Sequence, residues 1–233
     1  MKTQHLSIFD IAGPVMVGPS SSHTAGACKI GQFARALFHG TPTKITFYLH
    51  GSFGEVYKGH ATDRALLAGT MKFHTSEPHI KDSFKIAEEK GIKYEFHKKN
   101  LGEKYHPNTV KIVLENSKRK MSVIGSSIGG GMIEILKIDN FKVYIKGRAG
   151  KYHSIVVYHD KKRTIVPKII QKLKRINIKV PQIQQTDYGK KTLSVLNLEG
   201  KDGKTVTLQD VVEMEKSMEG VDFIRSLSKL QRQ

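Results

Sequence analysis

The sequence has only one cysteine, Cys28, and no tryptophan among its 233 residues. A single thiol excludes an internal disulfide framework. It also cannot by itself hold a zinc ion or a conventional iron-sulfur cluster, which need about three or four ligands. We therefore expect no metal site made by this chain alone.

Long apolar runs are also lacking. No stretch approaches the roughly 20 apolar residues that span a bilayer, and the opening residues, MKTQHLSIFD, have no apolar core of the kind found in signal peptides. From this we expect a cytoplasmic protein with no membrane partner. The 38% hydrophobic and 26% charged content is ordinary for a globular chain, so disorder is not indicated, and the length suits two modest domains.

Acidic residues are scarce, 21 against 39 basic ones, which gives a formal charge of +18. Such an excess suggests nucleic-acid binding, because basic patches gain affinity by releasing counterions from phosphates. The excess is spread over both halves of the chain, however, and no common nucleic-acid motif is visible. We expect solvated lysine-rich faces and no nucleic-acid partner.

The first region of the chain mixes Gly-rich turns, helices and short strands. Periodicity predicts these helices and strands: helices at residues 25–39, 61–73 and 83–90, and strands at 44–50, 94–98, 109–114, 118–124 and 141–146. The glycines at 51 and 54 predict a turn after the first strand. The short polar segment 147–151 suits a linker, which places the domains at residues 1–148 and 152–233.

The second region predicts a strand at residues 154–159, a helix at 164–175, strands at 178–186 and 191–198, a helix at 208–218 and a strand at 221–228. This β-α-β-β-α-β order is that of the ferredoxin-like fold, in which two helices cover one face of a four-stranded antiparallel sheet. The fold class is therefore α+β.

The strongest local pattern is Gly-Pro-Ser-Ser-Ser-His-Thr at residues 18–24, directly before the first helix. A helix N-terminus has unpaired N–H groups and a positive dipole end, so it binds carboxylates or phosphates, and serine hydroxyls add donors. In the competing interpretation Ser22 or Thr24 is an ordinary N-cap. Both interpretations remain open.

Three further patterns carry polar groups. Lys-Gly-His-Ala-Thr-Asp at residues 58–63 precedes the second helix, where His60 could move a proton and Asp63 or Thr62 could orient it or bind an amine. The turn His-Pro-Asn-Thr at 106–109 would fix its polar side chains, and three glycines at 129–131 would let backbone N–H groups approach a ligand. Taken singly, each is also explained as a capped helix start, a structural turn or a β-bulge.

Taken together and in this order, these motifs and the run Ser-Ile-Phe-Asp-Ile at residues 7–11 closely resemble the β domain of bacterial iron-sulfur L-serine dehydratases. The resemblance spans residues 1 to about 148. This part also resembles the allosteric substrate-binding domain of some phosphoglycerate dehydrogenases. The remainder resembles the ACT domain that closes the β subunit in two-subunit forms of the enzyme.

The resemblance implies an L-serine ammonia-lyase that converts L-serine to pyruvate and ammonia. It implies a [4Fe-4S] cluster in a separate alpha subunit, acting as a Lewis acid on the serine hydroxyl. His60 and His106 become the catalytic candidates, with His60 moving the proton. The substrate-binding candidates are Ser20, Ser22, His23 and Thr24 for the carboxylate, Asp63 and Asn108 for the amino group or the imidazoles, and Gly129, Gly130 and Gly131 as backbone donors.

Two departures from the family pattern matter. Position 61 is alanine where many relatives have glycine, a small change that we expect to leave the turn intact. The loop at residues 159–164 lacks the Pro-Gly that commonly follows its aspartate in ligand-binding ACT domains. We therefore expect this domain to serve in assembly, for which a homodimer is one form, rather than in effector binding.

One rival function remains open. The same fold serves as an effector domain elsewhere, so the chain could be a non-catalytic serine-binding regulatory module that needs no partner. His60 and His106 favour catalysis, because an effector pocket would need only the carboxylate-binding groups.

Overall fold

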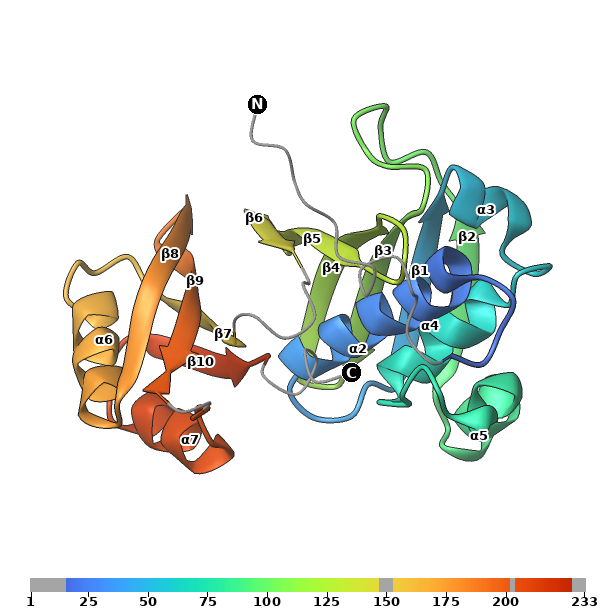
Figure 1. Ribbon diagram of the computed structural model, residues 1–233. Helices are drawn as coiled ribbons and strands as arrows, with labels where there is room; N and C mark the ends of the chain where they lie inside the picture. Colours follow the sequence, from blue (N-terminus) through green and yellow to red (C-terminus); the bar gives the residue numbers. More distant parts are fainter. Residues whose placement is uncertain (1–15, 147–152, 202–203, 228–233) are drawn as a thin grey trace. The chain divides into compact units, whose positions relative to one another are not determined.

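A computed structural model describes residues 16–146, 153–201 and 204–227 of the chain (Figure 1). The chain divides into two compact units, and the division falls within and after β6 (Phe141–Lys146), whose first residues group with the second unit. The linker predicted at 147–151 lies outside the described residues. No helix of the described part is long and apolar enough to cross a membrane.

The first unit is built on a six-stranded sheet of order β2-β1-β3-β4-β5-β6. Its strands are β1 (Lys44–His50), β2 (Lys93–Lys98), β3 (Thr109–Asn116), β4 (Arg119–Ser127), β5 (Ile133–Ile138) and β6. β1 and β2 run parallel, whereas β1 with β3, β3 with β4 and β4 with β5 pair antiparallel. Only the β1–β2 connection therefore needs a long crossover, and it carries most of the helices.

The helical elements are η1 (Ser21–Gly26), α2 (Ala27–Leu37), α3 (Ser52–Val56), α4 (Thr62–Thr70), η2 (Pro78–Asp82) and α5 (Ser83–Glu89). Figure 1 shows α2 and α4 side by side along one face of the sheet, and α2 contacts β3, β4 and β5. Alternation along the strands explains this face: Ile45, Phe47 and Leu49 of β1 are fully buried beneath the helices, while the residues between them are less so.

α2 and α4 pack at unusually short range because both carry glycine at the crossing. A Cβ on Gly31 would lie 2.5 Å from the carbonyl oxygen of Leu66, and a Cβ on Gly69 would lie 2.1 Å from that of Cys28. Either side chain would collide with helix backbone, which cannot move aside cheaply. The two glycines therefore set the spacing of the two helices whose starts carry the candidate motifs.

The second unit contains β7 (His153–Asp160), α6 (Ile165–Arg175), β8 (Ile178–Tyr188), β9 (Lys191–Gly200), α7 (Leu208–Lys216) and β10 (Val221–Ser226). The sheet order is β10-β7-β9-β8, with every printed pairing antiparallel. Apolar residues of both helices and of β7, β9 and β10 share one buried cluster, so both helices cover the same face. The predicted β-α-β-β-α-β order is confirmed.

Several predicted boundaries were wrong by a few residues. The first helix begins at Ser21 rather than residue 25, because a π-helical turn extends it into the serine run. The turn predicted at 51–54 is the start of the short helix α3, and the helix predicted at 61–73 ends at Thr70. Sequence analysis gave no bounds for β5, whose isoleucine-rich stretch follows the glycine run.

Candidate functional site

His23 is the best-fixed imidazole of the first unit. Its Nε2 lies 3.1 Å from Oγ of Ser52, and its backbone N–H donates to Oγ of Ser20 at 3.1 Å. The ring packs edge-on against Phe53 and lies 4.9 Å from the ring of His60, centroid to centroid. Two predicted site histidines, far apart in sequence, are therefore neighbours.

The serine run forms η1, a π-helical turn that continues directly into α2. Ser20 is its N-cap, and Thr24 donates its backbone N–H to the carbonyl of Ser20 at 2.8 Å. Single π-turns occur frequently at functional sites because they aim a side chain away from its ordinary helical direction. The N-cap is Ser20, two positions before Ser22 and four before Thr24, so the ordinary N-cap interpretation was wrong for both candidates considered from sequence. Capping accounts for Ser20, but not for the imidazole of His23.

His60 stands immediately before α4, where the chain makes a tight left-handed turn. Ala61 has φ of 54°, a conformation that is costly for any residue with a Cβ. Oγ1 of Thr24 donates to the carbonyl oxygen of His60 at 3.2 Å, and Nδ1 of His60 lies 3.4 Å from the carbonyl oxygen of Val56. The turn thus ties the start of α4 to η1.

The N-termini of α2 and α4 lie together. Thr24 in η1 contacts His60 just before α4, and Gly31 farther along α2 contacts Gly69 near the end of α4, so the two helices run in the same direction. Because α2 and α4 run in the same direction, the positive ends of their dipoles lie together. These two positive ends repel each other, which favours binding of an anion between them. Thr62, in the first turn of α4, is fully buried, and its hydroxyl has no hydrogen-bond partner among the described residues.

Asp63 is buried in the first turn of α4, where its carboxylate accepts the backbone N–H of Arg64 at 2.8 Å. Burial raises the pKa of Asp63, and the bond to the Arg64 backbone opposes this rise. No hydrogen bond within the described residues joins it to an imidazole. The predicted role of orienting His60 therefore has no direct contact behind it, while a role near an amine stays a prediction.

The turn at residues 106–109 packs against the turn that carries Ser52. The backbone N–H of Phe53 donates to the carbonyl oxygen of Pro107 at 3.3 Å, and a Cβ on Gly51, whose φ is 52°, would lie 2.8 Å from Cα of Pro107. Only glycine fits there. His106 is exposed and Asn108 half-buried, so both lie at the rim of the site rather than within it.

The glycine run closes the other side of η1. The backbone N–H of Ser127 donates to the carbonyl oxygen of Asn108 at 2.9 Å, and Oγ of Ser127 lies against Gly26, where a Cβ would be 2.0 Å away. Nζ of Lys29 donates to the carbonyl oxygen of Gly131 at 3.0 Å. All four motifs therefore gather around η1 and the start of α4.

Burial lowers the pKa of His23 from its ordinary value, and the neighbouring His60 lowers it further. A lowered pKa keeps the imidazole neutral near pH 7, the form that accepts a proton. A neutral imidazole can donate one hydrogen bond and accept another, so His23 can contact both Ser52 and a bound ligand.

Sequence analysis missed four residues that the structure places at or near the site: Ser52, Lys29, Gly31 and Gly69. Gly51 and Ser52 follow a strand, which was a usable indication of a turn at a sheet edge. Lys29, Gly31 and Gly69 sit inside helices, and no local pattern distinguishes them from ordinary helix residues. Only the packing of α2 on α4 and on the loop after β4 identifies them.

The donor set of this chain does not fit an iron-sulfur cluster. Cys28 is fully buried, its Sγ donates to the carbonyl oxygen of Phe73 at 3.5 Å, and burial raises its pKa to about 12. No group of three or more His, Cys, Asp or Glu residues within the described ranges could hold a metal ion. A cluster held by this chain alone would lack its thiolate ligands.

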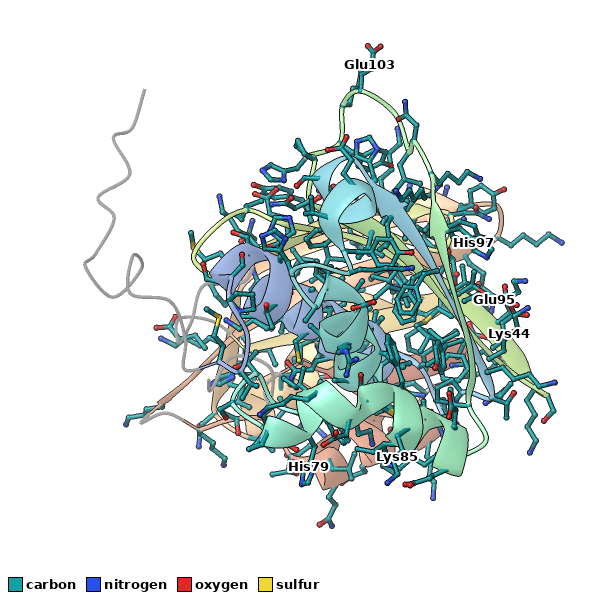
Figure 2. All side chains as sticks on the ribbon, turned by 90° about the vertical axis from the view of Figure 1, so that its right-hand side faces the viewer. Lys44, His79, Lys85, Glu95, His97 and Glu103 are labelled. Carbon is teal, nitrogen blue, oxygen red and sulfur yellow. The ribbon has the colours of Figure 1, made fainter. Side chains whose placement is uncertain are left out.

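Other polar groups lie on the surface outside the site. Figure 2 shows Lys44, Glu95 and His97 along β1 and β2; Lys44 forms an ion pair with Glu95 at 3.0 Å, and Nε2 of His97 lies 3.3 Å from Oε2 of Glu95. His79 and Lys85 lie at another end of the same view, on η2 and α5. His79 and Lys85 are exposed and serve as controls.

Comparison with known proteins bears on the same segment. The family model described as serine dehydratase beta chain matches residues 7–137. The probable L-serine dehydratase beta chain of Bacillus subtilis (strain 168) is 39% identical over 198 residues, covering 84% of this chain and 88% of that protein. The L-serine dehydratase beta chain of Peptoniphilus asaccharolyticus is 44% identical over 162 residues, covering 69% and 71%.

A shorter match, 39% identical over 75 residues, joins 31% of this chain to 16% of an L-serine dehydratase of Helicobacter pylori (strain J99). The family match includes η1, the start of α4, the turn at 106–109 and the glycine run, which are the parts that the structure brings together. With this match covering more than half of the chain, and two relatives aligned over most of it, the chain belongs to the serine dehydratase beta chain family.

Proposed function

We propose that this chain acts as the beta subunit of an enzyme that converts L-serine to pyruvate and ammonia by dehydration. The observation that carries the proposal is the contact between His23 and His60 at two adjoining helix N-termini. Such a place suits the carboxylate of an amino acid, and the imidazoles suit removal of a proton from its α carbon.

The roles within the site follow from position. Ser20, Ser22, His23 and Thr24 would hold the substrate carboxylate at η1, with the backbone of residues 129–131 nearby. His60 would move the α proton. His106 and Asn108 lie at the rim, where they would meet the substrate amino group or orient the imidazoles, and Asp63 would act on the amine.

The proposal includes an alpha subunit that holds a [4Fe-4S] cluster. This part of the proposal rests on the family resemblance and on the side chains that this chain could offer as ligands. Its one thiol, Cys28, is buried, and burial strongly disfavours the thiolate form that a cluster needs. His106 and Pro107 at the rim are exposed and Asn108 is half-buried, as expected of a surface that a second subunit would close.

We further propose that the second unit is an ACT-like domain that serves in assembly. Asp160, at the end of β7, lies 2.8 Å from Nζ of Lys191, which also reaches Asp222 at 2.6 Å. Because the Asp160 carboxylate is already paired with Lys191, it is poorly placed to bind the amine of an effector. Light scattering of the purified chain, compared with a truncation after residue 151, would show whether this unit makes a homodimer.

The test of the main proposal is anaerobic co-expression of this chain with a neighbouring Cys-rich reading frame, followed by assay of pyruvate from L-serine. We expect activity only with both chains. His60→Ala should lower kcat about 10²- to 10⁴-fold, the range for loss of a general base. His79→Ala is the control, because His79 is exposed and lies outside the site.

A complex that contains its cluster and yet makes no pyruvate would reject catalysis in favour of the serine-binding regulatory module. That module predicts L-serine binding by this chain alone, which calorimetry would measure. L-threonine should be assayed alongside, since nothing in the described site excludes the additional methyl group.

A further inference from the structure

Lys29 is a partly buried cation with no carboxylate beside it. Its Nζ donates to the carbonyl oxygen of Gly131 at 3.0 Å. Burial lowers the pKa of Lys29, and the neighbouring Cys28 thiol opposes this effect. No ion pair within the described ranges includes it. An ammonium has three N–H donors, so two remain for a ligand after the bond to Gly131.

The loop that Lys29 touches has the shape of an anion cradle. Its three consecutive glycines have φ of 103°, 57° and 73°. Two backbone bonds close the loop, from the N–H of Ile128 to the carbonyl of Met132 at 3.0 Å and from the N–H of Met132 to the carbonyl of Gly129 at 2.9 Å. No hydrogen bond of the described residues uses the N–H groups of the three glycines, so these donors remain for a ligand.

Ser127, the residue before this loop, supplies an independent indication. It is fully buried, and its hydroxyl has no hydrogen-bond partner among the described residues. The hydroxyl lies against Gly26, one helical turn before Lys29 on α2. Since side chains on a helix lean toward its N-terminus, the long Lys29 side chain extends toward the same place.

We propose that Lys29 supplies the positive charge of a carboxylate seat that continues the η1 donors and also includes the Ser127 hydroxyl and the N–H groups of residues 129–131. The ligand is the carboxylate of the amino-acid substrate, so the inference rests on the proposed function. The seat adjoins η1, which places the α carbon of a bound amino acid toward the imidazoles. Lys29, Ser127 and the loop thus add to the carboxylate-binding groups proposed at η1, while His60 acts on the α carbon beyond them.

The test uses the complete two-subunit enzyme and the variants Lys29→Met, Lys29→Arg and Ser127→Ala. We expect Lys29→Met to raise KM for L-serine about 10- to 100-fold with kcat changed less than about threefold, as for the loss of a hydrogen bond to a charged group. Lys29→Arg keeps the charge and should recover part of this loss. The control is Lys85→Met, whose side chain is 79% exposed (Figure 2).

L-Serinamide separates substrate binding from loop support, because it lacks the carboxylate charge. Its inhibition constant should be the same for wild type and Lys29→Met. Equal weakening of serine and serinamide, or an unchanged KM for serine, would overturn the proposal. If Lys29→Met does not fold, Ser127→Ala decides, since it breaks no hydrogen bond of the described residues and should raise KM severalfold. An unchanged KM in that variant would also overturn the proposal. Wild-type enzyme that makes no pyruvate would instead refute the proposed function.

Discussion

Replacing Ala61 by glycine should stabilise this protein, although glycine usually destabilises. Ala61 has φ of 54° and precedes α4 without a side-chain cap. A left-handed conformation costs an L residue roughly 1–2 kcal/mol, which glycine avoids. Glycine loses more backbone entropy on folding, roughly 0.5–1 kcal/mol, so the net gain is about 0.5–1 kcal/mol.

The free energy of unfolding can be measured by urea titration, with thermal melting as a second measurement. For a chain of this length, about 1 kcal/mol corresponds to roughly 2–4 °C in Tm. Gly91→Ala is the matched control: Gly91 has φ of 65°, and a Cβ there would meet nothing within 4 Å. Here alanine would take on the left-handed conformation that glycine adopts without strain, so Gly91→Ala should lower the free energy of unfolding by about 0.5–1 kcal/mol.

A lower stability of Ala61→Gly would refute the reasoning, provided that Gly91→Ala loses stability as expected. It would mean that the methyl group of Ala61 makes packing contacts that outweigh the backbone strain. If both variants lie within error of wild type, the left-handed penalty itself is smaller here than assumed.

Three further predictions concern the groups around the site. Gly69→Ala should destabilise the fold by about 1–3 kcal/mol, because the new Cβ would lie 2.1 Å from a carbonyl oxygen of α2. Urea titration tests this against Gly59→Ala, where the nearest atom to the new Cβ would be 3.8 Å away. Equal losses in the two variants would count against the packing argument. The pKa of His23 in the folded protein lies below its unfolded value of 6.5, so on acidification the unfolded state takes up this proton first. The free energy of unfolding of wild type should therefore fall relative to that of His23→Gln as the pH drops below about 6.5. A difference between the two proteins that does not change with pH would contradict the lowered pKa. Cys28, with a pKa raised to about 12, should resist iodoacetamide at pH 8 in the native chain and react promptly in urea, as mass spectrometry would show, and rapid native labelling would mean that α2 opens readily.

Much of the fold was predictable from the sequence because its elements carry local patterns. β1 and β6 have the bounds expected from alternation, and the second unit has the expected order of helices and strands. β5, whose bounds were not predicted, shows why local patterns can be insufficient. β5 follows a glycine run and pairs with β4 through a register shift, so its identity depends on a partner strand rather than on its own periodicity.

The candidate site was predictable in composition more than in arrangement. The motifs around His23, His60, Asn108 and Gly131 were each visible, and the structure gathers them around η1. Their chemical roles remain predictions. Asp63 illustrates the difference: its motif suggested an orienting carboxylate, whereas the fold directs that carboxylate to the backbone of its own helix.

The sequence by itself determined the family, the two-region organisation and the lack of thiolates for a cluster, because these depend on residue identity and local order. The tertiary structure decided which groups meet. Gly31 and Gly69 bring two parallel helices into backbone contact, Gly51 admits the turn at Pro107, and Lys29 reaches a glycine loop about a hundred residues away in sequence. These contacts join segments distant in the chain, and no local pattern encodes such distances.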